Sequence, residues 1–221
     1  MKNRRFFLIL SFLSNMLIFV MAFYAVGMSF RHQGRAEFGG SGFITFRFFT
    51  TDSNILAGIL SLIAGFTGLR ALVRGEDRLP AFAVTLKYIG AVAVSLTFTV
   101  VLVFLGPVFG YGSMYLGSSF YMHGVIPILT VVSFIAFDRG KRLPKRTILF
   151  AMIPVVLYGI VYFTEVVLIG QARGGWKDFY GFTRGGCWWL SLILCFGGAA
   201  LLAVLIRLLH NACEGRKEKN S

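Results

Sequence analysis

The sequence lacks polar stretches long enough to form a soluble domain. Its 221 residues include only 9 acidic side chains and 5 prolines, and the longest connection between apolar runs covers residues 31–48. Independently folding domains need about 50 residues or more. We therefore expect residues 1–221 to form a single domain that is built from the apolar runs themselves.

The motifs that bind metals, phosphates and dinucleotides are also missing. Three cysteines, Cys187, Cys195 and Cys213, have neither paired spacing nor a histidine nearby, which excludes a disulfide framework and a zinc site. No glycine-rich phosphate loop or dinucleotide fingerprint occurs. We therefore expect neither a metal nor another cofactor. The absence of an internal repeat argues against an inverted-repeat transporter.

Long apolar runs dominate the chain instead. Hydrophobic residues make up 57% of it, and its mean hydropathy is +0.75. A helix needs about 20 residues to cross the hydrocarbon of a membrane, and helices satisfy their own backbone amides there. Six runs of this length are bounded by charges, glycines or prolines: residues 6–30, 49–73, 80–105, 118–137, 147–170 and 187–209. The sequence predicts an all-α, polytopic membrane protein with a single bundle of six transmembrane helices and a polar tail at residues 210–221.

The net charge of +13 would suggest a nucleic-acid partner in a soluble protein. Here, 16 of the 22 Lys and Arg residues fall in the two terminal segments and in the second and fourth connections with their flanks, where Lys87 is included. By the positive-inside rule, both termini are then cytoplasmic. The basic excess indicates contact with anionic lipid at the cytoplasmic face, and we expect no nucleic-acid partner.

Three reactive side chains are predicted to share one depth below the outer membrane surface. Thr50 lies in the first turn of the second run, His123 lies five residues inside the fourth, and Glu165 lies five residues before the end of the fifth. Five helical residues correspond to roughly 7 to 8 Å of depth. Polar groups are costly in or near lipid, so these three are candidates for function.

Helical periodicity groups the small and polar residues on faces that we expect to point into the bundle. The second run carries such a face at Thr50, Ser53, Asn54, Ala57, Gly58 and Ser61, the fourth at Ser119, His123, Pro127 and Thr130, and the fifth at Pro154, Tyr158, Tyr162 and Glu165. As substrate-binding residues we predict Ser53, Ala57, Gly58, Ser119, Tyr158, Tyr162 and Tyr180. Asp52 lies about 200° from Thr50 around a helix, so we expect it to be a cap or loop partner.

Each of these residues also has a simpler structural interpretation. Thr50 or Thr51 fits the N-cap of a helix. Small residues on a helix face often serve helix packing, and His123 fits a hydrogen bond to a neighbouring helix. Glu165 near the interface fits a hydrogen bond to a tyrosine.

Three short motifs carry a resemblance to a known membrane family. They are Phe48–Asn54 at the start of one helix, Tyr121–Pro127 at the start of another, and Asp178–Phe182 before the last. The chain resembles the bacterial, uncharacterised branch of the androgen-induced gene one protein family, whose animal members include the androgen-dependent TFPI-regulating protein. The resemblance covers most of the chain, with six helices in the same order, and it implies a bacterial cell membrane as the location.

The resemblance implies a threonine hydrolase. The animal relatives cleave fatty acid esters of hydroxy fatty acids with a threonine and a histidine inside the membrane. On this chain the threonine corresponds to Thr50 and the histidine to His123. The spacing from threonine to Asn54 is one residue longer here, which leaves Thr51 as a second candidate nucleophile, and the substrate is not assumed to be the same.

The chemistry of these residues agrees with that role. A threonine hydroxyl is a weak nucleophile that needs a general base, and a neutral imidazole is such a base near pH 7. His123 is the only histidine in the predicted core. Asn54 or the amides at the helix start are candidate donors to an oxyanion. Glu165 or a tyrosine is the candidate that orients His123.

The sequence therefore predicts hydrolysis or transfer of a lipid acyl ester. Thr50 attacks the ester, His123 moves the proton, and the small-residue face of the second run accommodates an acyl chain. Two other classes stay open. One is a proton-coupled transporter or channel that uses His123 and Glu165 as a relay, and the other is a non-catalytic membrane scaffold whose polar faces only join helices.

Overall fold

A computed structural model describes residues 2–31 and 42–218, and in these residues it contains helices and no β-strand. Six helical segments are long and apolar enough to cross a membrane, which confirms the predicted fold class. They are α1 (Lys2–Arg31), α2 (Phe49–Val73), α3 (Ala81–Val100) with its continuation, α7 (Ile126–Ala136) with the turns before it, α8 (Thr147–Phe163) with its continuation, and α9 (Trp188–Glu218).

Three of the six segments contain a π-helical stretch, in which hydrogen bonds close wider turns. The third segment runs from α3 through η2 (Val101–Leu105) into α4 (Gly106–Phe109). The fourth begins with α6 (Ser118–Phe120) and η3 (Tyr121–Val125) before α7, and the fifth ends with η4 (Thr164–Ile169). Short helices η1 (Gly42–Arg47), α5 (Tyr111–Met114), η5 (Gln171–Arg173) and η6 (Arg184–Gly186) lie in the connections.

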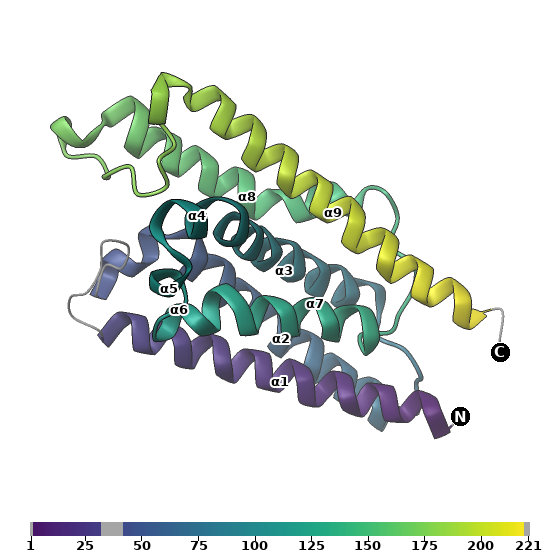
Figure 1. The fold of residues 1–221 in the computed structure, drawn as a ribbon. Helices are drawn as coiled ribbons and strands as arrows, with labels where there is room; N and C mark the ends of the chain where they lie inside the picture. The colour runs from purple at the N-terminus through teal and green to yellow at the C-terminus, as the bar shows by residue number, and fades with distance from the viewer. Residues whose placement is uncertain (1, 32–41, 219–221) are drawn as a thin grey trace.

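Helix α3 lies at the centre of the bundle (Figure 1). It contacts α2, α7, α8 and α9, while α1 packs against α2 and α7. Helices α8 and α9 form a hairpin that lies across α3. The first residues of α1 and the last of α9 lie at the same end of the bundle. We call this the terminal end, and the opposite end, where α2 begins, the Thr50 end.

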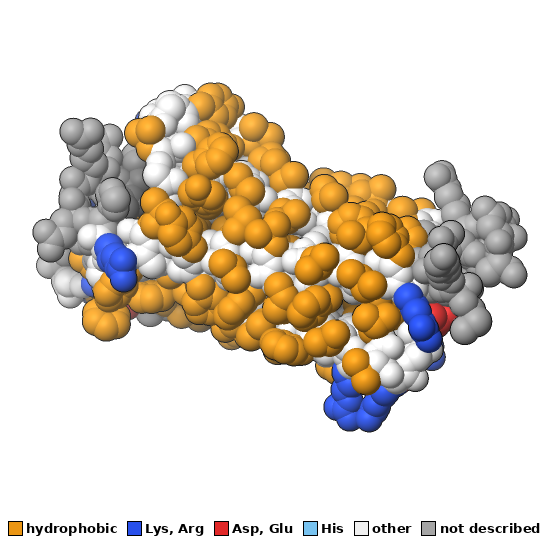
Figure 2. All heavy atoms as spheres, turned by 90° about the horizontal axis from the view of Figure 1, so that it is seen from below, with side chains coloured by type: hydrophobic (Ala, Val, Ile, Leu, Met, Phe, Trp, Pro, Cys, Tyr) orange, Lys and Arg blue, Asp and Glu red, His pale blue; other side chains and the backbone are white. Residues whose placement is uncertain are grey.

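The surface has the composition expected of a membrane protein. Hydrophobic side chains cover the middle of the face seen in Figure 2, and Lys and Arg side chains lie toward its two ends. Leu13, Leu17 and Val20 of α1, for example, are each at least half exposed. Such an apolar band costs little only where lipid covers it.

The expected end of the last helix is wrong. The last helix continues past residue 209 to Glu218, so His210 belongs to it and is only 1% exposed instead of lying in a polar tail. His123 is therefore not the only buried histidine. Lys87, near the start of α3, is also only 1% exposed, and its ammonium donates to Ser61 of α2 at 2.7 Å.

Candidate active site

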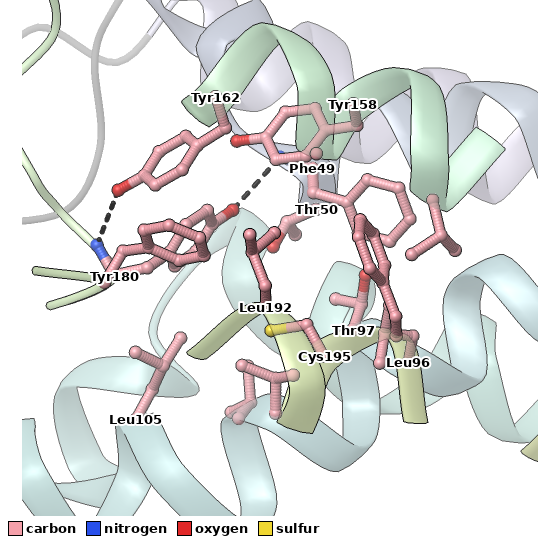
Figure 3. Close-up of a pocket in the computed structure, with 16 residues that line it drawn as sticks. Phe49, Thr50, Leu96, Thr97, Leu105, Tyr158, Tyr162, Tyr180, Leu192 and Cys195 are labelled. Atoms are coloured by element: carbon pink, nitrogen blue, oxygen red, sulfur yellow. Dashed lines mark hydrogen bonds between the residues drawn. The ribbon is translucent and has the colours of Figure 1, made fainter. Parts of the chain in front are cut away.

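The first turn of α2 is capped from a distant part of the chain. The N-cap is Phe48, which makes no side-chain capping bond, so neither Thr50 nor Thr51 is the N-cap. The backbone N–H of Phe49 instead donates to the hydroxyl oxygen of Tyr180 at 3.0 Å (Figure 3). An amide at a helix start has no partner within the helix. Tyr180, which we expected to bind substrate, therefore fixes the position of Thr50.

Thr50 is half-buried and lies on the wall of a cavity of about 90 Å³, which we call the Thr50 cavity (Figure 3). Its wall comes from α2, α3, η2, α8, α9 and the connection before α9. The lining residues are Phe49, Thr50, Leu96, Thr97, Val100, Val101, Leu105, Val155, Tyr158, Gly159, Tyr162, Tyr180, Phe182, Leu192, Cys195 and Phe196. Three of the predicted substrate-binding residues, all tyrosines, thus meet Thr50 at one cavity.

The three tyrosines are held by hydrogen bonds on their polar ends. The hydroxyl of Tyr158 donates to the carbonyl oxygen of Arg47 at 2.7 Å. The hydroxyl of Tyr162 accepts from the backbone N–H of Tyr180 at 3.1 Å (Figure 3). Burial raises the pKa of Tyr180 to about 12, although hydrogen bonding with Tyr158, Phe49 and Thr50 offsets part of this effect. Tyr180 therefore keeps its proton at neutral pH.

Asp178 organises the connection that carries Tyr180. Its carboxylate accepts from the backbone N–H groups of Phe182 and Thr183 at 2.7 Å each, from the Thr183 hydroxyl at 2.7 Å and from the Tyr162 hydroxyl at 2.9 Å. Burial alone would raise its pKa, but these hydrogen bonds outweigh burial and leave the pKa below its ordinary value. The carboxylate is therefore ionised at neutral pH.

The other polar residues at the start of α2 face three different partners. Thr51 is buried, and its hydroxyl lies 3.3 Å from that of Thr45 in η1, away from the Thr50 cavity. The hydroxyl of Ser53 lies 2.9 Å from that of Thr97 on α3. Asp52 lines a second cavity, of about 320 Å³, between α2 and α8. Thr50 and Asp52 thus point into different cavities, as their separation around the helix predicts.

Asn54 connects the Thr50 segment to the His123 segment. Its amide nitrogen donates to the carbonyl oxygen of Thr50 at 2.7 Å and to that of Met122 in η3 at 3.2 Å. Because both bonds share one nitrogen, the two carbonyl oxygens lie within about 6 Å of each other. The amide oxygen of Asn54 is buried and accepts no hydrogen bond.

His123 is buried in the π-helical segment η3. Its Nδ1 lies 2.6 Å from the carbonyl oxygen of Met114. Since a carbonyl only accepts, Nδ1 carries the proton and the neutral ring has its free lone pair on Nε2. The expected orienting partner, Glu165 or a tyrosine, is therefore replaced by a backbone carbonyl. His123 is not among the residues that line the Thr50 cavity.

Glu165 and Ser119 lie apart from this arrangement. Glu165 is half-buried in η4, which packs against α8 and η5, whereas η3 packs against α1, α2 and α3. Ser119 is half-buried on α6 and lines neither of the two cavities described above. The sequence matched the depth of Glu165 and His123 but could not give the angular position of their helices in the bundle.

The small residues of α2 serve helix packing, which the sequence left open as an alternative. A Cβ on Gly58 would stand 3.0 Å from the Cβ of Ala22 on α1. A Cβ on Gly90 of α3 would stand 3.1 Å from the Cα of Ala57. Ala57 and Gly58 line neither cavity, so the expectation that they form an acyl groove is not met.

Sequence reasoning missed two partners in this region. Met114 acts through its backbone carbonyl, which leaves no signature in a side-chain pattern. Thr97 of α3 lines the Thr50 cavity, and its hydroxyl forms a hydrogen bond with that of Ser53. The only sign of this role in the sequence is that Thr97 is a polar residue within an apolar run. Within residues 2–31 and 42–218, no three His, Cys, Asp or Glu side chains gather closely enough to hold a metal ion.

Comparisons with protein-family models, with curated proteins and with solved structures give no match for this chain.

Proposed function

We propose that this protein is an intramembrane hydrolase or acyltransferase of lipid esters, with Thr50 as the nucleophile and His123 as the general base. The observation that carries the proposal is the double hydrogen bond of Asn54, which holds the Thr50 and Met122 carbonyls within about 6 Å of each other. His123 directly follows Met122. The resemblance of three motifs to a family of threonine hydrolases agrees with this pairing.

The proton position on His123 supports its role as base. With Nδ1 bonded to the Met114 carbonyl, Nε2 is free to accept the proton of a hydroxyl. Catalytic hydrogen bonds often tighten only when the substrate is bound, so a side-chain rotation of Thr50 toward Nε2 is compatible with this role. Both His123 and the cavity wall at Val101 and Leu105 belong to π-helical segments, which occur frequently at functional sites.

The surroundings of Thr50 support stabilisation of negative charge. Thr50 is in the first turn of the 25-residue helix α2, where the helix dipole favours an anion. The Tyr180 hydroxyl accepts the N–H of Phe49 and is protonated, so its own proton is available to an oxyanion. An oxygen that develops charge near Thr50 would therefore meet a hydrogen-bond donor and a positive helix end.

The Thr50 cavity favours an ester with apolar substituents. Its wall is almost entirely apolar apart from Thr50, Thr97 and the tyrosine hydroxyls. At about 90 Å³ it is smaller than the roughly 150 Å³ that hold one benzene molecule. It therefore accommodates the atoms next to the ester, and the remainder of an acyl chain extends between the helices into lipid.

The reaction proceeds in two steps. Thr50 Oγ1 bonds to the ester carbonyl carbon while its proton passes to His123 Nε2, and the alcohol leaves with that proton. In hydrolysis, water then bonds to the acyl carbon, gives its proton to His123, and the acid leaves as Thr50 recovers its proton. In transfer, an acceptor alcohol takes the place of water. The charge pattern predicts that the Thr50 end faces the outer side of the membrane, and we therefore expect substrate to enter from the outer leaflet.

An activity-based probe for serine and threonine hydrolases tests this proposal. The wild type in detergent or nanodiscs should be labelled, whereas Thr50→Ala and His123→Ala should not. Thr50→Ser should keep labelling because it retains a nucleophilic hydroxyl. Thr51→Ala should also keep it, since Thr51 faces Thr45 instead of the cavity.

Thr67→Ala is a matched control, because the Thr67 hydroxyl bonds only to its own helix at Ile63. Each variant must elute as the same monodisperse species before labelling is compared. Equal labelling of wild type and Thr50→Ala would reject Thr50 as nucleophile, and loss of labelling in Thr51→Ala alone would transfer the role to Thr51. A scaffold without catalysis predicts no labelling of any form.

The transporter alternative has less support. A relay needs His123 and Glu165 to be connected, and the segments that carry them pack against different neighbours. Proton flux in liposomes that persists in Thr50→Ala but is lost in Glu165→Gln would nevertheless favour it.

A further inference from the structure

A second group of buried polar residues lies toward the terminal end. Lys87 of α3 and Asp138, just after α7, are each 1% exposed. Oδ1 of Asp138 accepts hydrogen bonds from Ser11 at 2.5 Å and from Asn15 at 2.8 Å, both on α1. Lys87 donates to Ser61 of α2 at 2.7 Å. Buried charges are costly unless they are paired and hydrogen-bonded, so this group needs an explanation of its own.

Hydrogen-bonding capacity remains in this group. Oδ2 of Asp138 and Oδ1 of Asn15 are buried and accept no hydrogen bond. The Lys87 ammonium has three N–H bonds, of which Ser61 takes one. Burial raises the pKa of Asp138, and the positive charge of Lys87 opposes that shift. Lys87 makes no hydrogen bond to Oδ2 of Asp138, so its effect on the carboxylate does not come from a bond to that oxygen.

A tight helix contact separates this group from the Thr50 cavity. Gly90 of α3 lies against Ala57 of α2 so closely that a Cβ would stand 3.1 Å from the Ala57 backbone. Along α2, Ser53 comes before this contact and Ser61 after it. The pair of Ser53 with Thr97 and the pair of Ser61 with Lys87 therefore lie on opposite sides of it.

Charge balance restricts what the second group binds. A cation would stand beside the Lys87 ammonium, and an anion would stand beside the Asp138 carboxylate. A neutral molecule that accepts one hydrogen bond and donates two matches one of the two unused N–H bonds of Lys87 and the free oxygens of Asp138 and Asn15. Internal water molecules typically make about three hydrogen bonds of this kind.

We propose that Lys87, Asp138 and Asn15 form a water-binding site in which one internal water molecule bridges the ammonium to the carboxylate. The water accepts from Lys87 Nζ and donates to Asp138 Oδ2 and Asn15 Oδ1. The site goes beyond the proposed ester chemistry and does not depend on it. Because the bridged pair has no net charge, removal of either charged group leaves the other unbalanced, whereas removal of both restores the balance.

Solid-state NMR of the full chain in lipid bilayers tests for this water. In protein with ¹⁵N-labelled lysine, magnetisation from water should reach Lys87 Nζ, whose signal is identified by its loss in Lys87→Met. The transfer should persist when a membrane-impermeant paramagnetic agent quenches the signals of exposed Lys141 and Lys145. Asn15→Leu, which removes one of the three partners of the water, should weaken it. Absence of transfer in the wild type, or unchanged transfer in Asn15→Leu, overturns the proposal.

Melting temperatures provide a second measurement. Lys87→Met and Asp138→Asn should each lower the melting temperature by roughly 6 °C or more, and the double variant should melt above both. Lys141→Met, at an exposed lysine, should leave it unchanged. If a single variant does not fold, folding of the double variant still shows that the charges are coupled. A double variant that melts below both single variants, or fails to fold, overturns the proposal.

Discussion

Among single residues, Asp178 should affect both the stability of the protein and the candidate site. Asn at this position keeps one acceptor oxygen but turns an NH₂ group toward N–H and O–H donors. Hydrogen bonds to charged groups contribute about 1.5 to 3 kcal/mol each. We expect Asp178→Asn to lower the melting temperature by roughly 5 °C or more and to weaken probe labelling, because the connection that carries Tyr180 loosens.

The stabilisation by Asp178 should also depend on pH. Its pKa in the folded protein is below the ordinary value of 3.8. The contribution is therefore fully present above that value and is lost as the pH falls through the lower, folded-state pKa. Asp178→Asn should remove this part of the acid dependence, whereas Glu76→Gln, at an exposed carboxylate, should not. Thermal unfolding of the three proteins between neutral and acidic pH measures the difference, and parallel curves for all three contradict the prediction.

The sequence could predict which polar residues gather at the Thr50 end, because depth follows from residue count along a helix. It could not predict their partners. Tyr180 caps Phe49 from 131 residues away, and Met114 orients His123 through a backbone oxygen. Glu165 lies at a similar predicted depth, but depth alone leaves open the angular position of its helix in the bundle.

At the scale of elements, the contact of α2 with α3 depends on Gly90. We expect Gly90→Ala to destabilise the protein by about 1 to 3 kcal/mol, because the added methyl group would press on the Ala57 backbone, which cannot rotate away. Gly27→Ala in α1 is the matched control, since a Cβ there meets nothing within 4 Å. The control should be neutral or stabilising by up to about 1 kcal/mol. Chemical denaturation in mixed micelles compares the two, and equal stabilities would contradict the predicted contact.

The existence of the six spanning helices follows from the length of the apolar runs, whereas the end of the last helix does not. The last apolar run predicts a helix that ends at residue 209, but the helix continues to Glu218. The ring of His210, one residue past the predicted end, stacks on Phe134 with 4.7 Å between the ring centroids. The π-helical segments were not predictable, because one extra residue in a turn leaves an apolar run almost unchanged. These segments carry His123 and Glu165.

At the scale of the whole molecule, the native cysteines test the orientation in the membrane. Cys187 is exposed at the Thr50 end, just before α9, and Cys213 is partly buried in the last turns of α9. If the basic terminal end faces the cytoplasm, a membrane-impermeant maleimide should label Cys187 in intact cells. Cys213 should react only after the membrane is opened. Cys187→Ser should abolish the first signal and keep the second. The opposite order of labelling would invert the orientation, and the Thr50 cavity would then receive substrate from the cytoplasmic leaflet.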